Sequence, residues 1–405
     1  MSIAGTGAPS VSGRSRSASP GRRPFRAVIA GGGVAAVEAA LALRAIAGER
    51  VELAIAAATP TFVYRPLAVV RPFQAVASYR LDLAGIAADL GATLVPEDAA
   101  AVEPDRHQVR LAGGGALDYD ALLIAIGAGA EPLLTGGTFT PWDWGEGHAF
   151  RSLLDALERG RNRAVAFIVP AGLTWPLPLY ELALLTDAFL RERAVGGVSL
   201  QVITAERAPL EVFGAEASRT VAALLEQRGI ALATGQETRA VEEGVVRTAD
   251  GRSIPVDATV ALPVIQARPL PGLPTDAAGF ISVDPQCRVP GTADVFAAGD
   301  CTDQPLKQGG LAAQQADVAA AGIAALAGVD VTPTTFDPVL EAVLLTGDVP
   351  LHLDAAGARP IRSEHDDADD RERREKIFAR YLTPYLAKAT PALPYFDIEP
   401  PATDS

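Results

Sequence analysis

The stretch AVIAGGGVAAVEAA, residues 27–40, sets the fold of the first part of the chain. Its apolar start is typical of a buried strand, and glycines lead directly into an alanine-rich run that favours a helix. Gly31 permits a tight turn out of the strand, Gly33 leaves room where a Cβ would obstruct a pyrophosphate, and Ala36 lets the helix lie close to the sheet. The free N–H groups of the helix start would then face the phosphates. The pattern predicts a dinucleotide site formed by Gly31, Gly33, Val34, Ala35 and Ala36.

The strand expected after this helix, residues 51–55, lacks one feature of such sites. In dinucleotide-binding units the second strand ends in an Asp or Glu that holds the ribose hydroxyls. Here the strand continues into Ala56, Ala57 and Ala58. We therefore expect ribose binding to be looser or to come from backbone groups.

The same plan of strand, turn, helix and strand occurs twice, in residues 26–56 and 164–205. Apolar strands that alternate with helices of this length predict parallel sheets in an α/β fold. Between the two segments, short strand-like stretches at 93–95 and 108–111 predict an antiparallel meander. We expect this meander to return to a buried strand at 121–126.

The expected division of the chain is a disordered tail, two dinucleotide-binding units of which the first is discontinuous, and a small C-terminal unit. Within the second unit, Asp250 and Gly251 lie between apolar stretches and predict a hairpin. The expected ranges are 1–25 for the tail, 26–138 with 257–330 for the first unit, 139–256 for the second unit and 331–405 for the C-terminal unit.

A second motif lies at residues 292–300, TADVFAAGD, in which an apolar strand leads through Gly299 to Asp300. It resembles the second FAD fingerprint of the flavoproteins with two dinucleotide-binding domains, the pyridine nucleotide-disulfide oxidoreductase superfamily. The stretch DALLIAIGA at 120–128 also matches a segment of that family, in which Gly127 lets the backbone pass near the cofactor. The resemblance implies FAD as the cofactor, with Asp300 accepting a hydrogen bond from a ribityl hydroxyl. It also implies two Rossmann-like domains, each with three layers in a ββα arrangement. The first, discontinuous unit would bind FAD, and the second would be NAD(P)-binding-like with a degenerate glycine motif.

Two loops look like flavin-facing segments of the branch that holds the sulfide:quinone oxidoreductases and the type II NADH dehydrogenases. TFVYRPL, residues 61–67, is similar to the loop that brings a proline, here Pro66, beside the isoalloxazine, and Tyr64 either contacts the flavin or belongs to the core. KQGGLAAQQA at 307–316 opens a helix whose start, in the family, faces the flavin pyrimidine edge. There Lys307 either stabilises negative charge on the flavin or is a solvent-facing loop residue. The resemblance adds Tyr64, Pro66, Lys307, Gly309 and Gly310 to the expected site.

The second strand–turn–helix departs from the pattern of a nicotinamide site. Its turn reads VPAGLTWPLPLYELA at residues 169–183, with three prolines and a single glycine, Gly172. Proline lacks the N–H that would bond a phosphate, so the usual pyrophosphate pose is disfavoured. Trp175 is either a pocket wall or part of the core. This pattern is closer to the sulfide:quinone branch, in which nicotinamide is not the electron donor.

The cysteines and histidines give no catalytic or metal assignment. Sulfide or disulfide chemistry needs a pair of thiols near the flavin, and Cys287 and Cys301 match no such spacing. Cys301 directly follows Asp300 and either lies near the cofactor or is a buried, inert thiol. The four histidines are scattered without ligand spacing, so we expect no metal.

Composition limits the partners and the compartment. The chain has 49 acidic and 35 basic residues and a net charge of −14, which argues against a general nucleic-acid binder. Two cysteines, no apolar leader and no long apolar run indicate a cytoplasmic protein. Apolar stretches at 381–386 and 393–396 offer either a peripheral contact with a membrane, or a dimer contact or a cover for the flavin unit.

The leading hypothesis is an FAD-dependent oxidoreductase that passes electrons from a small-molecule donor through flavin to a quinone-like acceptor. An NAD(P)H:acceptor reductase with an unusual nicotinamide site is the first alternative. A flavin-loaded regulatory protein without a donor site is the second. The sequence assigns no catalytic residue, and it leaves the donor and the choice between a monomer and a homodimer open.

Overall fold

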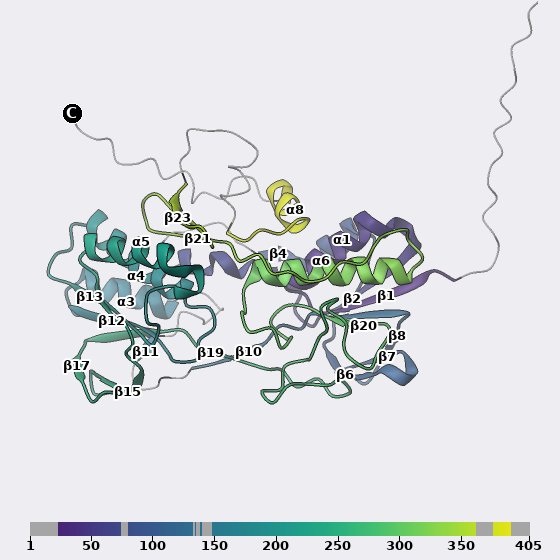
Figure 1. Cartoon of the computed structure of the whole chain (residues 1–405), viewed down its shortest axis with the longest axis horizontal. Coiled ribbons are helices and arrows are strands. Elements are labelled where there is room, and N and C mark those ends of the chain that lie inside the picture. The colour runs from purple at the N-terminus through teal and green to yellow at the C-terminus, as the bar shows by residue number, and fades with distance from the viewer. Residues whose placement is uncertain are drawn as a thin grey trace, which may run out of the picture.

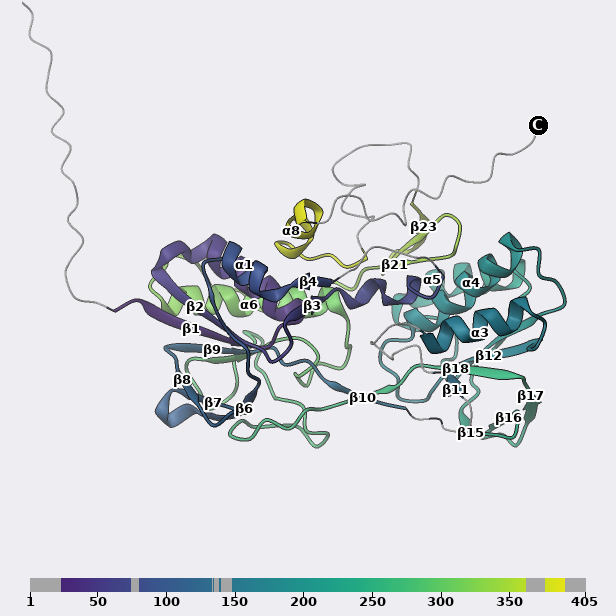
Figure 2. The ribbon, with the colours of Figure 1, turned by 180° about the vertical axis from the view of Figure 1, so that it is seen from behind.

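The computed structural model describes residues 23–73, 80–132, 134, 138–139, 148–361 and 376–389. Almost all of the expected tail at 1–25 lies outside these residues, and so does the apolar stretch at 393–396. Figures 1 and 2 show two sheets toward opposite ends of an elongated molecule, with helices on one side of both sheets and small antiparallel sheets on the other. The predicted α/β class is confirmed.

The first sheet has five parallel strands in the order β20-β9-β1-β2-β5. The glycine-rich stretch therefore follows a central strand. Strand β20 comes late in the sequence but pairs with β9, so a segment from beyond the second sheet completes the first one. The strands are β1 (Phe25–Ala30), β2 (Val51–Ala56), β5 (Thr93–Val95), β9 (Ala121–Ile124) and β20 (Val295–Ala297).

Both faces of this sheet are buried, which explains its apolar strands. Ala27 and Ile29 of β1 pack toward the helices, whereas Val28 and Ala30 pack toward the small antiparallel sheet. On the helix side, α1 (Val34–Ala47) and α6 (Gly309–Leu326) lie against each other, which their many alanines allow. Helix α2 (Leu83–Asp89) and the 3₁₀ helices η1 (Gly48–Arg50) and η2 (Arg65–Val70) complete that side.

The predicted meander was wrong at its first strand. Residues 93–95 form β5, which pairs in parallel with β2, because helix α2 precedes it and returns the chain to the edge of the main sheet. The antiparallel meander lies on the other face and is built from β6 (Ala99–Glu103), β7 (Gln108–Leu111) and β8 (Ala116–Asp118). The buried strand expected at 121–126 ends two residues early, at Ile124.

The second sheet repeats the plan, with parallel strands in the order β11-β18-β12-β13-β14. Its antiparallel partner, β15-β16-β17, contains the predicted hairpin at Asp250 and Gly251. The strands are β11 (Thr138–Phe139), β12 (Ala164–Val169), β13 (Ser199–Thr204), β14 (Ala231–Ala233), β15 (Thr238–Glu242), β16 (Val245–Thr248), β17 (Ser253–Pro255) and β18 (Ala258–Ala261). The helices are α3 (His148–Glu158), α4 (Leu177–Glu192) and α5 (Gly214–Gln227).

Two further strand pairs join these parts. β10 (Gly129–Glu131) and β19 (Val264–Gln266) run antiparallel where the chain leaves the first sheet and returns to it. β3 (Thr61–Val63) and β4 (Arg80–Asp82) form a second antiparallel pair.

The C-terminal unit lies over the helices of both sheets (Figures 1 and 2). It consists of the antiparallel strands β21 (Ala342–Leu344), β22 (Leu351–Asp354) and β23 (Gly357–Pro360) and of helix α8 (Leu382–Ala389). Leu382 and Leu386 are buried, and the Tyr385 hydroxyl donates to Asp89 at 2.8 Å. These leucines of the stretch 381–386 therefore cover the first unit and are not free for a bilayer. None of the helices in the described part of the chain is long and apolar enough to span a membrane.

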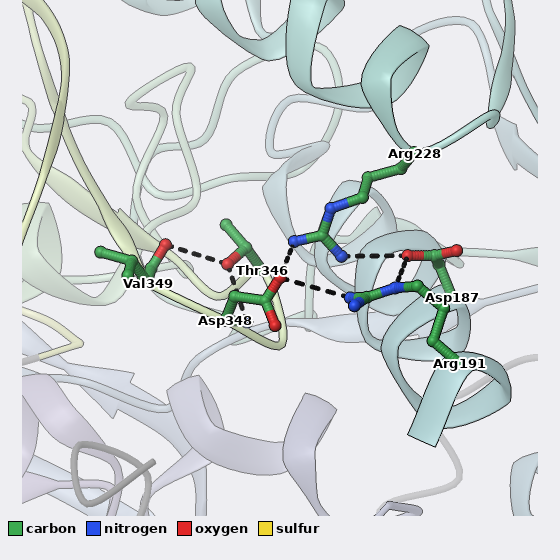
Figure 3. Close-up of polar contacts among 6 residues, drawn as sticks. All are labelled: Asp187, Arg191, Arg228, Thr346, Asp348 and Val349. Carbon is green, nitrogen blue, oxygen red and sulfur yellow. Dashed lines mark hydrogen bonds and ion pairs between the residues drawn. The ribbon is translucent and has the colours of Figure 1, made fainter. Parts of the chain in front are cut away.

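An ion-pair cluster attaches the C-terminal unit to helices α4 and α5 of the second unit (Figure 3). The Arg228 guanidinium donates to Asp187 of α4 at 3.0 Å and also to Asp348, which lies in the loop between β21 and β22. Arg191 donates to Asp348 at 3.3 Å. Because Arg228 and Asp187 are each only 12% exposed, this pair is better shielded from solvent than an ordinary surface ion pair.

Candidate functional site

The glycine turn after β1 is closed by a backbone crossing. Gly31 has φ +131°, and a Cβ there would lie 2.1 Å from the carbonyl oxygen of Ala125. The Gly31 amide donates to the Ala56 carbonyl at 2.8 Å. The turn therefore sits between the ends of β2 and β9, and only glycine fits at its first position.

Gly33, unlike Gly31, has open space beside it. It is exposed, and a Cβ there would meet no described atom within 4 Å. It is the N-cap of α1, and no side chain of the described residues caps this helix. The first turn also holds no acidic residue. Ala35 and Ala36 are buried, so this end of the helix presents mainly backbone N–H groups, and their free hydrogen-bonding capacity fits a pyrophosphate.

Gly299 brings the second motif against the first. It has φ +82°, and a Cβ there would lie 3.2 Å from Cβ of Ala35 and 3.5 Å from Cβ of Ala312. The loop after β20 thus touches the starts of both α1 and α6. The motifs at residues 27–40 and 292–300, which were predicted to bind one cofactor, therefore lie side by side.

Gln315 of α6 fixes this loop, and the sequence analysis missed it. Its buried side chain accepts a hydrogen bond from the Gly299 amide at 2.8 Å and donates to the Thr302 hydroxyl at 3.2 Å. A buried amide is stable only when it is hydrogen-bonded. The signal that could have found it is a lone polar residue on the buried side of an alanine-rich helix.

Two cationic side chains, Lys307 and Arg65, lie near Asp300. Burial raises the pKa of its carboxyl group, and the nearby cations Lys307 and Arg65 act in the opposite direction. The Lys307 ammonium donates to the Thr302 carbonyl at 2.5 Å and lies 3.8 Å from the ring centroid of Phe280. Burial lowers the pKa of Lys307. Lys307 is half-buried and lies beside the loop that contains Asp300.

The start of α6 meets the loop that follows β3. A Cβ at Gly309 would lie 3.6 Å from Cγ of Pro66 and 3.2 Å from Cγ2 of Ile377, which belongs to the C-terminal unit. Gly310 is buried, and Tyr64 is only 4% exposed and packs in the large core cluster. Ile377 was not among the predicted site residues, because no local sequence pattern links it to α6.

Gly127 follows β9 at the same end of the sheet as the glycine turn. It has φ +65°, and no described atom lies within 4 Å of a Cβ built there. Its conformation favours glycine, and the space beside it is open.

The turn of the second unit is built differently from that of the first. Residues 31–33 connect β1 to α1, whereas residues 170–176 connect β12 to α4. Helix α4 has Pro176 as its N-cap and Pro178 in its first turn. Trp175 is half-buried and packs edge-on against Phe213, with 5.8 Å between the ring centroids. The short glycine cradle of the first unit has no counterpart here.

Glu206, after β13, occupies the place where a dinucleotide-binding unit keeps its ribose-binding acid. Its Oε2 accepts hydrogen bonds from the Tyr180 hydroxyl at 2.6 Å and from the Thr204 hydroxyl at 2.9 Å. Tyr180 is completely buried. One carboxylate oxygen is therefore already bound within the protein, a feature that the sequence analysis did not predict.

The two cysteines are 1% and 3% exposed, at Cys287 and Cys301 respectively. Burial raises the pKa of each thiol to about 12. Because the thiolate is the reactive form, burial and the raised pKa disfavour reaction of either thiol at neutral pH. Among the residues that the structure describes, no three His, Cys, Asp or Glu side chains gather as a metal site.

Comparisons with known proteins agree with this architecture. The fold is similar to that of the sulfide:quinone oxidoreductase from the hyperthermophilic bacterium Aquifex aeolicus, with a TM-score of 0.72, 20% identity and coverage of 81% of this chain and 83% of that one. It is also similar to NDH2 from Plasmodium falciparum in complex with NADH, with a TM-score of 0.67, 12% identity and coverage of 84% and 92%. A ferredoxin reductase from Rhodopseudomonas palustris gives a TM-score of 0.62, 20% identity and 81% coverage of both chains.

By sequence, no curated protein matches the chain. The model of the family described as pyridine nucleotide-disulphide oxidoreductase matches residues 11–146 and 185–321, which is more than half of the chain. The chain therefore belongs to the pyridine nucleotide-disulphide oxidoreductase family and is an FAD-dependent oxidoreductase.

Proposed function

We propose that this enzyme takes electrons from a small-molecule donor other than a nicotinamide nucleotide and delivers them to a quinone-like acceptor. FAD, when bound, supplies the two-electron chemistry, and the protein supplies position and electrostatics. The pyrophosphate would lie at Gly31, Gly33 and the N–H groups of Val34, Ala35 and Ala36. Asp300 would hold the ribityl chain.

The remaining positions of the proposed site surround the ring system. Tyr64 and Pro66 come from the loop after β3, Gly127 from the end of β9, and Lys307, Gly309 and Gly310 from the start of α6. The helix N-terminus and the Lys307 ammonium would stabilise negative charge in this region. Gly299 lets the Asp300 loop approach α1.

We propose a donor other than a nicotinamide nucleotide because of the turn of the second unit, residues 170–176. Its connection is longer than that of the first unit, and α4 begins among prolines that lack N–H groups. Glu206 is engaged by Tyr180 at 2.6 Å, so the position expected to bind a ribose is partly occupied. Both features weaken the binding of a dinucleotide in the usual pose.

The buried thiols restrict the route of the electrons. A disulfide reductase passes electrons through a reactive cysteine pair, and Cys287 and Cys301 are buried with a raised pKa. We therefore assign no protein thiol to the reaction. The donor would react with the flavin directly.

The acceptor is inferred from the apolar contacts at the start of α6. Ile377 is 3% exposed and lies beside Gly309 and near Pro66, so the C-terminal unit contributes an apolar side chain to this region. Apolar side chains beside the proposed flavin position would suit an aromatic, weakly polar acceptor such as a quinone. The similar structure from Aquifex aeolicus is described as a sulfide:quinone oxidoreductase, which supports the same choice.

Anaerobic spectroscopy of the purified holoenzyme tests the proposal. We expect NADH and NADPH to leave the oxidised flavin spectrum unchanged, and a water-soluble quinone to reoxidise the enzyme after reduction by dithionite. Sulfide is titrated in parallel as a candidate donor. Failure of the quinone to reoxidise the flavin contradicts the proposed acceptor.

A second candidate function is an NAD(P)H:acceptor reductase. One observation favours it: within the described residues no side chain caps α4, and a Cβ at Gly172 would meet none of their atoms within 4 Å. A nucleotide phosphate would find unpaired N–H groups at this helix start despite the prolines. Rapid bleaching of the flavin by NADH or NADPH in the same titration would select this candidate.

A further inference from the structure

The end of β2 carries no acid for the ribose of a bound dinucleotide, although it lies beside the glycine turn. A Cβ built at Gly32 would be 3.2 Å from Cβ of Ala57 and 3.8 Å from Cγ2 of Thr59. The carboxyl ends of neighbouring parallel strands meet at one edge of a sheet, and ligands bind at this edge. The end of β2 is therefore well placed to bind a ribose, but the methyl side chain of Ala57 cannot accept a hydrogen bond from it.

A carboxylate reaches this position from the next strand. β5 pairs in parallel with β2, and Asp98 follows β5 by three residues. Its Oδ1 accepts a hydrogen bond from the Ala58 amide at 3.0 Å. Asp98 is exposed, so its carboxylate stands at the solvent side of the edge where β2 ends.

One oxygen of the Asp98 carboxylate has no partner within the described part of the chain. Among the residues described here, the hydrogen bond from Ala58 uses Oδ1, and Oδ2 takes part in no hydrogen bond or ion pair. The anchored oxygen fixes the orientation of the group. A carboxylate held in this way can accept from a ribose hydroxyl, which is the task of the missing acid.

We propose that Asp98 binds the ribose hydroxyls of the adenosine half of FAD, in place of an acid at the end of β2. This inference rests on the proposed cofactor site at Gly31 and Gly33. It assigns the adenosine end of the site to a residue that follows β5, on the strand next to β2.

A neighbouring acid provides a matched control. Glu97 precedes Asp98, and its Oε2 accepts a hydrogen bond from the Gly113 amide at 2.8 Å. Glu97 therefore makes the same kind of bond in the same turn, but toward the hairpin between β7 and β8. Glu97→Gln keeps an oxygen for the Gly113 amide and removes no acceptor from the end of β2.

The experiment compares FAD with an FAD analogue that lacks the 2′-hydroxyl of the adenosine ribose. The full-length protein is freed of flavin, and the dissociation constant of each ligand is measured by the quenching of flavin fluorescence. A hydrogen bond to a charged group supports a preference of about tenfold or more for FAD in the wild-type protein. Asp98→Asn keeps an oxygen for the Ala58 amide but removes the charge, so it should reduce this preference, whereas Glu97→Gln should retain it.

Thermal unfolding of the flavin-free variants separates binding from folding. We expect Asp98→Asn and Glu97→Gln to unfold at the same temperature as the wild-type protein. Equal affinity of the wild type for FAD and its analogue, or an unchanged preference in Asp98→Asn, overturns the role of Asp98 and leaves the proposed function intact. Failure of the wild-type protein to bind FAD at all overturns the proposed cofactor site instead.

Discussion

The ammonium of Lys376 donates a hydrogen bond to the carboxylate of Glu181, and the two side chains, 4% and 0% exposed, form a buried ion pair between α4 and the C-terminal unit. Glu181 also accepts from the Leu345 amide at 2.8 Å, and Lys376 donates to the Val343 carbonyl at 2.6 Å. Burial raises the pKa of Glu181 and lowers that of Lys376, and each partner opposes the shift of the other. The pair thus joins distant parts of the chain at a site that water does not reach.

Replacing one partner of this pair should destabilise the protein strongly. Lys376→Met leaves the Glu181 carboxylate buried without its counter-charge, which costs about 3–5 kcal/mol. Urea denaturation followed by circular dichroism measures the loss.

The double variant Glu181→Leu/Lys376→Met is the control for this first prediction. It removes both charges and should be more stable than either single variant, because no charge stays buried alone. Single variants within about 1 kcal/mol of the wild-type protein would contradict a closed, water-free pair.

Two glycines of the same turn should behave in opposite ways when replaced by alanine. Gly31→Ala places a Cβ 2.1 Å from the Ala125 carbonyl oxygen in a backbone conformation with φ +131°. We expect a loss of several kcal/mol in stability or no soluble protein. Gly33→Ala meets no described atom within 4 Å, so the flavin-free protein should keep its unfolding temperature.

The second half of that comparison concerns the cofactor. A Cβ at Gly33 occupies the space proposed for the pyrophosphate, so FAD affinity should fall by about tenfold or more, corresponding to roughly 1.4 kcal/mol or more. Fluorescence titration of the flavin-free variant gives the affinity. Unchanged FAD binding by Gly33→Ala would move the pyrophosphate away from this turn.

The stability of the protein should decrease as the pH rises toward 8 because of one buried and one half-buried carboxyl group, Glu38 and Asp317. Glu38 accepts hydrogen bonds from the amides of Tyr381 and Leu382 at 2.8 and 2.5 Å. Burial, followed by the charge of Asp317, raises the pKa of Glu38 from 4.5 to about 8, and burial raises the pKa of Asp317 to about 6. The positive charge of Arg380 partly opposes the shift at Asp317.

The sign of this pH effect follows from proton uptake. A carboxyl group whose pKa is higher in the folded state binds protons on folding, so its stabilising contribution is complete at low pH and is lost as the pH rises toward 8. The loss from one such group is at most about 1.4 kcal/mol for each pH unit. Melting temperatures should fall between pH 6 and pH 8, and Glu38→Gln should flatten that slope. A Glu38→Gln protein with the wild-type slope would assign the pH dependence to other groups.

Arg228 should contribute more to stability than Arg191, although both bond to Asp187 and Asp348 (Figure 3). The Arg228 side chain is 12% exposed and that of Arg191 is 47% exposed. We expect Arg228→Met to cost about 1–3 kcal/mol, and Arg191→Met less than about 1 kcal/mol. Urea denaturation of the two variants under one set of conditions checks the order, and equal losses would contradict it.

The fold class and the glycine-dependent parts of the site follow from short stretches of sequence. Residues 27–40 indicate a strand, a tight turn and a helix, because apolar runs and glycines act on their immediate neighbours. The motif that ends at Asp300 could likewise be recognised from nine consecutive residues, 292–300. The three-residue strand β5 was misassigned, because it is too short to show a periodicity that distinguishes a parallel edge strand from a meander.

Contacts between distant segments arise only when the chain packs. The approach of Asp98 to Ala58, of Gln315 to Gly299 and of Ile377 to Gly309 joins positions that no local pattern connects. Each depends on strand order or helix packing, which bring together backbone groups from separate elements. The sequence motifs therefore predicted where a dinucleotide would bind. The neighbours that shape the binding site were decided only by the tertiary structure. The reason is that hydrogen bonds and van der Waals contacts act over a few ångströms in space, whatever the separation of the residues along the chain.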